Sequence, residues 1–80
     1  MIDKYIVRSI INMFIFLEFS DDALVNEDAA VSQMEALACE LQCAALETRI
    51  HLSAQMRELS TEYGERSDFV RNLPQAVGLE

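Results

Sequence analysis

Apolar side chains recur at spacings of three and four residues through most of the chain, which is the period of one face of an α-helix. In the first segment, from about Asp3 to Phe19, this stripe is joined by apolar residues on almost every other side. A helix that is apolar nearly all round must be buried nearly all round. The pattern therefore predicts a central helix, a dimer interface or a partner site. We predict self-association through four residues of the main stripe: Ile6, Ile10, Phe14 and Leu17.

A second helix is predicted from about Glu27 to Cys43, after a polar loop. Asn26 is a good N-cap because its side-chain oxygen accepts hydrogen bonds from free backbone N–H groups. Glu27 and Asp28 follow in the first turn, where negative charge complements the helix dipole. The apolar stripe of this helix consists of Ala30, Met34, Leu37, Ala38, Leu41 and Ala45.

A third helix follows, in which Leu52, Met56 and Leu59 repeat at helical spacing until Gly64, a natural helix stop. No glycine or proline separates the second helix from the third. The apolar stripe nevertheless shifts near residues 44–46, so we expect a kink or a short turn there. One continuous helix over residues 26–63 is the alternative, and it would make a long helical hairpin or a coiled coil.

The last segment is predicted to hold a short helix, with Ser67 as its cap and Pro74 as a barrier to regular continuation. Leu79–Glu80 resemble a cloning remnant, and no structural role is predicted for them. The chain has only two glycines and one proline in 80 residues, which argues against a sandwich or a barrel. We predict one all-α domain over residues 1–80, a bundle of three to four helices that self-associates through the first.

The predicted second helix carries another stripe, roughly opposite the apolar one, that is built from small residues: Ala29, Ser32, Ala36, Cys39 and Cys43. Acidic residues border this stripe on both edges: Asp28, Glu35, Glu40 and Glu47. Two interpretations stay open. The small side chains are either exposed or covered by another helix of the same chain, or they form a shallow groove with acidic rims that fits a basic partner.

The net charge is −8, and the excess of acid lies in the middle of the chain. Residues 18–48 hold eight carboxylates and neither lysine nor arginine. Such a field repels nucleic-acid phosphates and anionic lipid head groups, so we expect no nucleic-acid and no membrane partner. It attracts basic proteins and speeds encounter with them. The other explanation is that the acids keep a small apolar protein in solution.

The chain offers little for catalysis or metal binding. Cys39 and Cys43 would share one helix face, and His51 is the only histidine, so a metal site would lack ligands. Nothing in the sequence brings His51 beside a thiol, and no phosphate-binding glycine loop is present. We expect no enzymatic activity, no metal and no cofactor, and a cysteine-dependent redox or metal protein is the most distant alternative. The first apolar run is too short for a membrane span and is a poor export signal, so we expect a cytoplasmic protein with reduced thiols.

Two stretches, FIFLEFSDDALVNEDAAV and SDFVRNLPQAVGLE, resemble segments of small, uncharacterised bacterial helical proteins. In size, acidity and helicity the chain is also similar to toxin-neutralising immunity proteins. This resemblance implies a non-enzymatic immunity or antitoxin-type protein that masks the basic surface of a toxin. Six acids are predicted to steer and contact the partner: Asp21, Asp22, Glu27, Asp28, Glu35 and Glu40. The alternative is a structural or regulatory homodimer whose acids serve only solubility.

Overall fold

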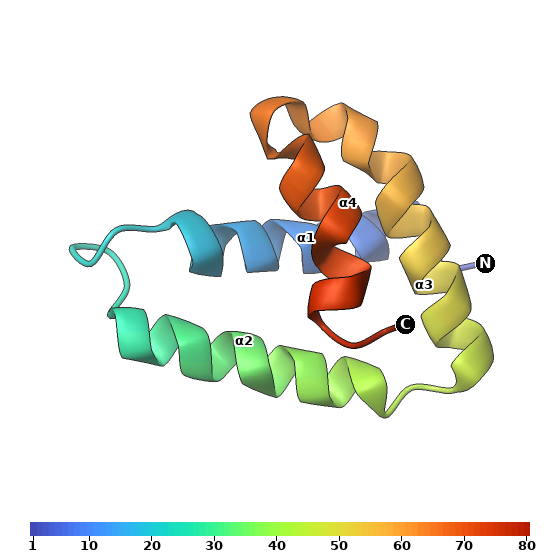
Figure 1. Cartoon of the computed structure of the whole chain (residues 1–80), viewed down its shortest axis with the longest axis horizontal. Coiled ribbons are helices and arrows are strands. Elements are labelled where there is room, and N and C mark those ends of the chain that lie inside the picture. Colours follow the sequence, from blue (N-terminus) through green and yellow to red (C-terminus); the bar gives the residue numbers. More distant parts are fainter.

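The computed structural model describes all 80 residues, and it contains helices and no strand. The elements in chain order are α1 (Lys4–Phe19), α2 (Glu27–Gln42), α3 (Leu46–Leu59), the 3-10 segment η1 (Ser60–Arg66) and α4 (Ser67–Ala76). In Figure 1, α1 and α2 follow the long axis of the molecule, while α3 and α4 cross them steeply. The expected all-α class is confirmed.

The hydrophobic core lies where α1, α3 and α4 meet, and α2 packs against it from one side. Ten buried residues form it: Val7, Ile11, Phe14, Leu52, Met56, Leu59, Val70, Leu73, Val77 and Leu79. The predicted repeat of Leu52, Met56 and Leu59 on α3 is therefore confirmed as a core face. At the start of α1, the Asp3 carboxylate accepts a hydrogen bond from the backbone N–H of Tyr5 at 2.8 Å and caps the helix.

Two of the four residues of α1 that are predicted to self-associate are buried within the chain itself. Phe14 is only 2% exposed and Leu17 only 8%, so neither is free to contact a second chain, contrary to the prediction. Ile10 is half-buried, and Ile6 alone among the four predicted residues is largely exposed. When a helix is apolar on all sides, its sequence shows the helical period but not which face is covered. Packing against α2 and α3 decides that face.

The start of α2 matches the prediction, because the Asn26 side chain accepts a hydrogen bond from the backbone N–H of Ala29 at 3.1 Å. Only Ala30 is buried on this helix. Four further residues of the predicted stripe are half-buried against the core: Met34, Leu37, Ala38 and Leu41. The helix ends at Gln42, and a turn over residues 43–45 precedes α3. The expected break is confirmed, and the continuous helix over residues 26–63 is wrong.

The corner between α3 and α4 is fixed to α1 by polar contacts. The Tyr63 hydroxyl donates a hydrogen bond to Asn12 Oδ1 at 2.9 Å, and Arg8 forms an ion pair with Glu62. Partial burial raises the pKa of Tyr63 above its ordinary value. At the corner itself, Gly64 takes φ 53° and ψ −122°, which interrupts the helical path as the sequence predicts.

Replacing Gly64 with alanine is expected to lower the free energy of unfolding by about 1–3 kcal/mol, because L residues are strained at this backbone conformation. A Cβ atom at this position would meet nothing within 4 Å, so the cost comes from the backbone alone. Urea unfolding followed by circular dichroism measures it. A Gly64→Ala protein as stable as the wild type would contradict the backbone geometry of this corner.

Two local predictions for α4 are wrong. Ser67 is the first helical residue rather than the cap, and its hydroxyl accepts a hydrogen bond from Arg71 Nη2 at 3.1 Å. The helix also continues through Pro74, which is buried, and ends at Ala76. Proline removes one helical N–H group, so it costs the helix one hydrogen bond. Burial of the proline ring in the core offsets that loss.

The final residues, for which the sequence predicts no role, close the core. Gly78 has φ 78°, and the backbone N–H of Leu79 donates to the Pro74 carbonyl at 2.9 Å, in the manner of a Schellman helix end. Leu79 is buried, and the Glu80 carboxylate forms an ion pair with Arg57. The hydrogen bond from Arg57 lowers the pKa of Glu80 below its ordinary value.

Candidate protein-binding site

The loop between α1 and α2 is ordered by one of its own acids. The Asp21 carboxylate accepts hydrogen bonds from the backbone N–H groups of Ala23 and Leu24, each at 3.1 Å. This is an Asx-type turn, so Asp21 has a local structural role in addition to the partner contact predicted for it. Its neighbour Asp22 is exposed and forms no hydrogen bond through its side chain.

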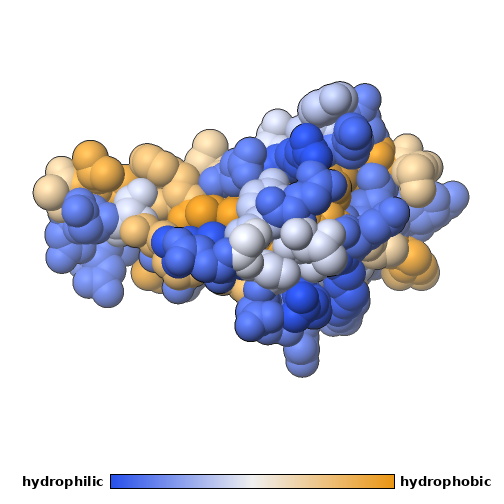
Figure 2. Space-filling model, turned by 90° about the horizontal axis from the view of Figure 1, so that it is seen from above, coloured by the Kyte–Doolittle hydropathy of each residue, from blue (hydrophilic) through white to orange (hydrophobic).

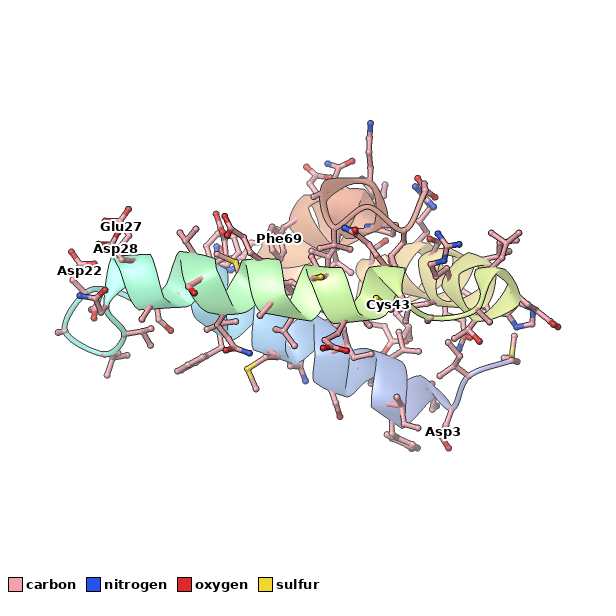
Figure 3. The ribbon with its side chains drawn as sticks, turned by 90° about the horizontal axis from the view of Figure 1, so that it is seen from below. Asp3, Asp22, Glu27, Asp28, Cys43 and Phe69 are labelled. Atoms are coloured by element: carbon pink, nitrogen blue, oxygen red, sulfur yellow. The ribbon has the colours of Figure 1, made fainter.

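The loop brings three of the predicted acids together at one end of the molecule. Asp22, Glu27 and Asp28 are all exposed, and Figure 3 shows them grouped at the start of α2. Glu27 and Asp28 lie in the first turn of the helix, where the helix dipole stabilises negative charge. Glu27 and Asp28 therefore stabilise the start of α2, and both carboxylates remain accessible to a partner.

An open hollow of about 420 Å³ lies between the end of α1, the loop and the start of α2. Its acidic side chains are Glu18, Asp21, Asp22 and Glu27. Its apolar side chains are Leu17, Val25, Ala30, Val31 and Met34. Negative charge therefore surrounds a small apolar surface rather than spreading over a uniformly polar one.

A second hollow of about 260 Å³, here called the α2–α4 groove, runs on from the first between α2, α4 and α1. Its apolar lining consists of Phe14, Val31, Met34, Ala38, Phe69, Leu73, Ala76 and Val77. Only Glu18 and Glu35 bring charge to it. Glu18, Val31 and Met34 line both hollows, so the two form one continuous surface.

Aromatic contacts hold the α4 side of this groove in place. The rings of Phe69 and Phe19 meet edge to face with their centroids 5.1 Å apart. The Arg66 guanidinium lies 3.7 Å from the centre of the Phe19 ring on the same side of the molecule. Figure 3 shows Phe69 on α4, beside α2. Edge-to-face and cation–π contacts of this kind stabilise a fixed side-chain arrangement.

The acids of the middle of the chain have no cationic partner. The three ion pairs of the molecule join Arg8 to Glu62, Arg57 to Glu80 and Arg71 to Asp68, and none involves residues 18–48. Two other arginines are occupied, since Arg49 donates to a backbone carbonyl and Arg66 lies over Phe19. The negative field around the hollows is therefore not compensated within the chain.

The predicted acids do not form one cluster. Glu35 reaches the α2–α4 groove, but Glu40 is about 140° around the helix axis from Glu35 and lies on the outer face of α2. The whole small-residue stripe is on that outer face and is exposed, including the free thiols of Cys39 and Cys43. Figure 3 shows Cys43 near the end of α2. The structure excludes cover of this stripe by another helix of the same chain, and the two hollows lie on another side of α2.

Glu18 was missed by the sequence prediction, although the chain carries a signal for it. It follows Phe14 by four residues and Ile11 by seven, which is the spacing of the buried stripe of α1. A carboxylate at a core position must reach water or a cation, because burying it unpaired is costly. The buried stripe of α1 thus ends at Glu18, where the helix lines the two hollows instead of the core.

No three histidine, cysteine, aspartate or glutamate side chains gather in a way that could hold a metal ion. His51 is half-buried on α3, while the two thiols are on the outer face of α2. The expectation of a metal-free and cofactor-free protein stays a prediction. None of the helices has the length and apolar character needed to cross a lipid bilayer.

Comparison of the chain with protein-family models, with curated proteins and with solved structures finds no match.

Proposed function

We propose that the chain is a non-enzymatic binding module that docks a basic, amphipathic helical segment of another protein in the α2–α4 groove. The observation that supports this most strongly is the combination of an apolar lining with Glu18 and Glu35 at its edge. An amphipathic helix in a groove buries its apolar face and leaves its polar face at the rim. Lysine or arginine on that polar face would meet the two carboxylates.

The adjoining acids would act at longer range. Asp22, Glu27 and Asp28 are exposed, unpaired and next to the same surface. Charges of this kind raise the rate of encounter with a basic protein more than they raise the final affinity. Neutralisation of a basic toxin by an immunity or antitoxin-type protein is the specific form of this function that we favour.

A structural or regulatory homodimer whose acids serve only solubility is the second candidate. It is supported by the apolar side chains that α1 leaves exposed. The two functions make different demands on the groove. Docking of a basic partner needs the groove and its carboxylates, whereas the homodimer needs neither.

A synthetic amphipathic peptide tests the docking function, with leucine on one face, lysine on the other and a single tryptophan. The chain contains no tryptophan, so the fluorescence reports the peptide alone. We expect saturable binding with a blue shift, weakened about tenfold between roughly 0.02 and 0.2 M salt. The control peptide carries glutamate in place of lysine and is expected not to bind. Equal binding of both peptides, or binding of neither, would contradict the proposal.

A further inference from the structure

The helix α1 has a second apolar surface that the rest of the chain leaves open. Tyr5, Ile6, Met13 and Phe16, here called the outer face of α1, are 64%, 56%, 48% and 50% exposed. Tyr5 and Phe16 lie on the side of the helix away from its buried stripe and the α2–α4 groove, and Ile6 and Met13 continue this surface up to the buried Leu17. In Figure 2, apolar surface is visible along the narrow part of the molecule, where the end of α1 and the following loop lie.

We infer that the outer face of α1 binds the same face of a second copy of this chain, with the two helices antiparallel about a two-fold axis. This inference does not rest on the proposed function, because it uses a different side of α1. The first reason is the local charge. Residues 3–18 carry two acids, Asp3 and Glu18, and two bases, Lys4 and Arg8, so α1 with its cap is neutral in a chain whose net charge is −8. Two copies therefore meet the least mutual repulsion along this helix.

The second reason is the direction of charge along α1. The helix begins with Lys4 and Arg8, which lie 5.4 and 5.9 Å from the centre of the Tyr5 ring. It ends at Phe19, and the acids Asp21 and Asp22 follow in the loop. Antiparallel packing places Lys4 of each copy towards the acidic loop of the other, while the charge of Arg8 is already paired with Glu62 of its own chain. Parallel packing would place like charges together, which is unfavourable.

The third reason is the match of side chains about one midpoint. In a two-fold contact, when residue i meets residue j, j also meets i. With the axis at residue 11, Ile6 of one copy lies opposite Phe16 of the other, and Ser9 opposite Met13. Ser9 is small, and its hydroxyl is already occupied by the Tyr5 carbonyl at 2.8 Å. It allows the helices to approach closely, since interaxial distance depends on the side chains at the crossing.

The available area sets the strength of this contact. Tyr5 and Phe16 each leave about 100 Å² open, from the roughly 150–250 Å² of an aromatic side chain. The four residues together offer roughly 400 Å² per copy, about half of what a stable interface buries. We therefore expect a reversible dimer with a dissociation constant on the order of 10–100 μM rather than a permanent one.

Sedimentation equilibrium of the full chain, over roughly 1–500 μM, tests the dimer. The wild type is expected to pass from monomer to dimer mass. Ile6→Asp is expected to raise the dissociation constant at least about tenfold, since the contact would bury an unpaired charge. Ile50→Asp is the matched control, because Ile50 is also 56% exposed and lies on α3. It is expected to dimerise like the wild type.

Lys4→Glu provides a second test that touches no buried residue. It is expected to weaken the dimer about three- to tenfold at low salt and to make added salt strengthen association rather than weaken it. A wild type that stays monomeric at every concentration would overturn the inference, as would equal losses in the Ile6 and Ile50 variants. Unchanged dimerisation of both Ile6→Asp and Lys4→Glu would overturn it too. Peptide binding in the α2–α4 groove is measured in a separate experiment. The dimer and the docking function can therefore be contradicted independently of each other.

Discussion

Replacing Phe14 with alanine is expected to lower the free energy of unfolding by about 3–5 kcal/mol. The side chain is 2% exposed and lies in the core between α1, α3 and α4. Its removal loses apolar burial and leaves a cavity that the neighbouring helices fill only in part. A domain of 80 residues has a total stability of about 4–12 kcal/mol, so the variant is expected to be largely unfolded or close to it.

Phe16→Ala is the matched control for this prediction. It removes the same side chain from the same helix at a position that is 50% exposed, and it is expected to cost within about 1 kcal/mol. Urea unfolding at low protein concentration, followed by circular dichroism, compares the two. Equal losses, or a larger loss for Phe16→Ala, would mean that α1 turns a different face to the core.

Glu18→Gln combined with Glu35→Gln is expected to slow association with the basic peptide about tenfold at low salt. Both residues lie at the edge of the α2–α4 groove. Asp21 is left unchanged because its carboxylate holds the loop turn. Exposed charge changes of this kind usually alter stability by less than about 0.5 kcal/mol, so the fold should persist. Stopped-flow tryptophan fluorescence measures the rate.

The control pair is Glu40→Gln with Glu47→Gln, which changes the net charge by the same amount away from the groove. It is expected to slow association by less than about twofold. Equal slowing by both pairs would show that only the net charge matters. If the Glu18→Gln and Glu35→Gln substitutions leave the association rate unchanged, these acids serve solubility alone.

The sequence predicts those features of the fold that depend on neighbouring residues. The Asn26 cap and the break over residues 43–45 follow from local backbone chemistry, and both are present. The helix α3 ends earlier than predicted, at Leu59, and Gly64 breaks the 3-10 segment that follows it. The inward face of α1 depends instead on which helices cover it. Phe14 and Phe16 look alike in the sequence because apolar residues surround both.

The end of the chain shows the same limit. Leu79 enters the core only because Gly78 turns the backbone and Gln42, on α2, donates a hydrogen bond to the Val77 carbonyl at 2.8 Å. The continuation of α4 through Pro74 likewise depends on burial of the ring. Contacts of this kind join residues more than 30 positions apart, and no periodicity in the sequence reports them.

The candidate site also has one part that the sequence predicts and one part that only the fold reveals. Charge counting alone identifies the acidic middle of the chain, and four of its six predicted residues line the two hollows: Asp21, Asp22, Glu27 and Glu35. The apolar part of the site needs α4 beside α2, which only the fold provides. Nothing in the sequence therefore indicates that Phe69 and Ala76 belong to the site. Glu18 could have been recognised, because it is a carboxylate at a position with the spacing of the buried stripe.

The most direct test of docking in the α2–α4 groove is nuclear magnetic resonance of the ¹⁵N-labelled protein titrated with the basic peptide. Changes in backbone amide shifts are expected to concentrate on both walls of the groove, at Val31, Glu35 and Ala38 of α2 and at Phe69 and Ala76 of α4. Changes confined to the outer face of α2, or an absence of any change at saturating peptide, would contradict the claim that this groove receives a basic helical partner.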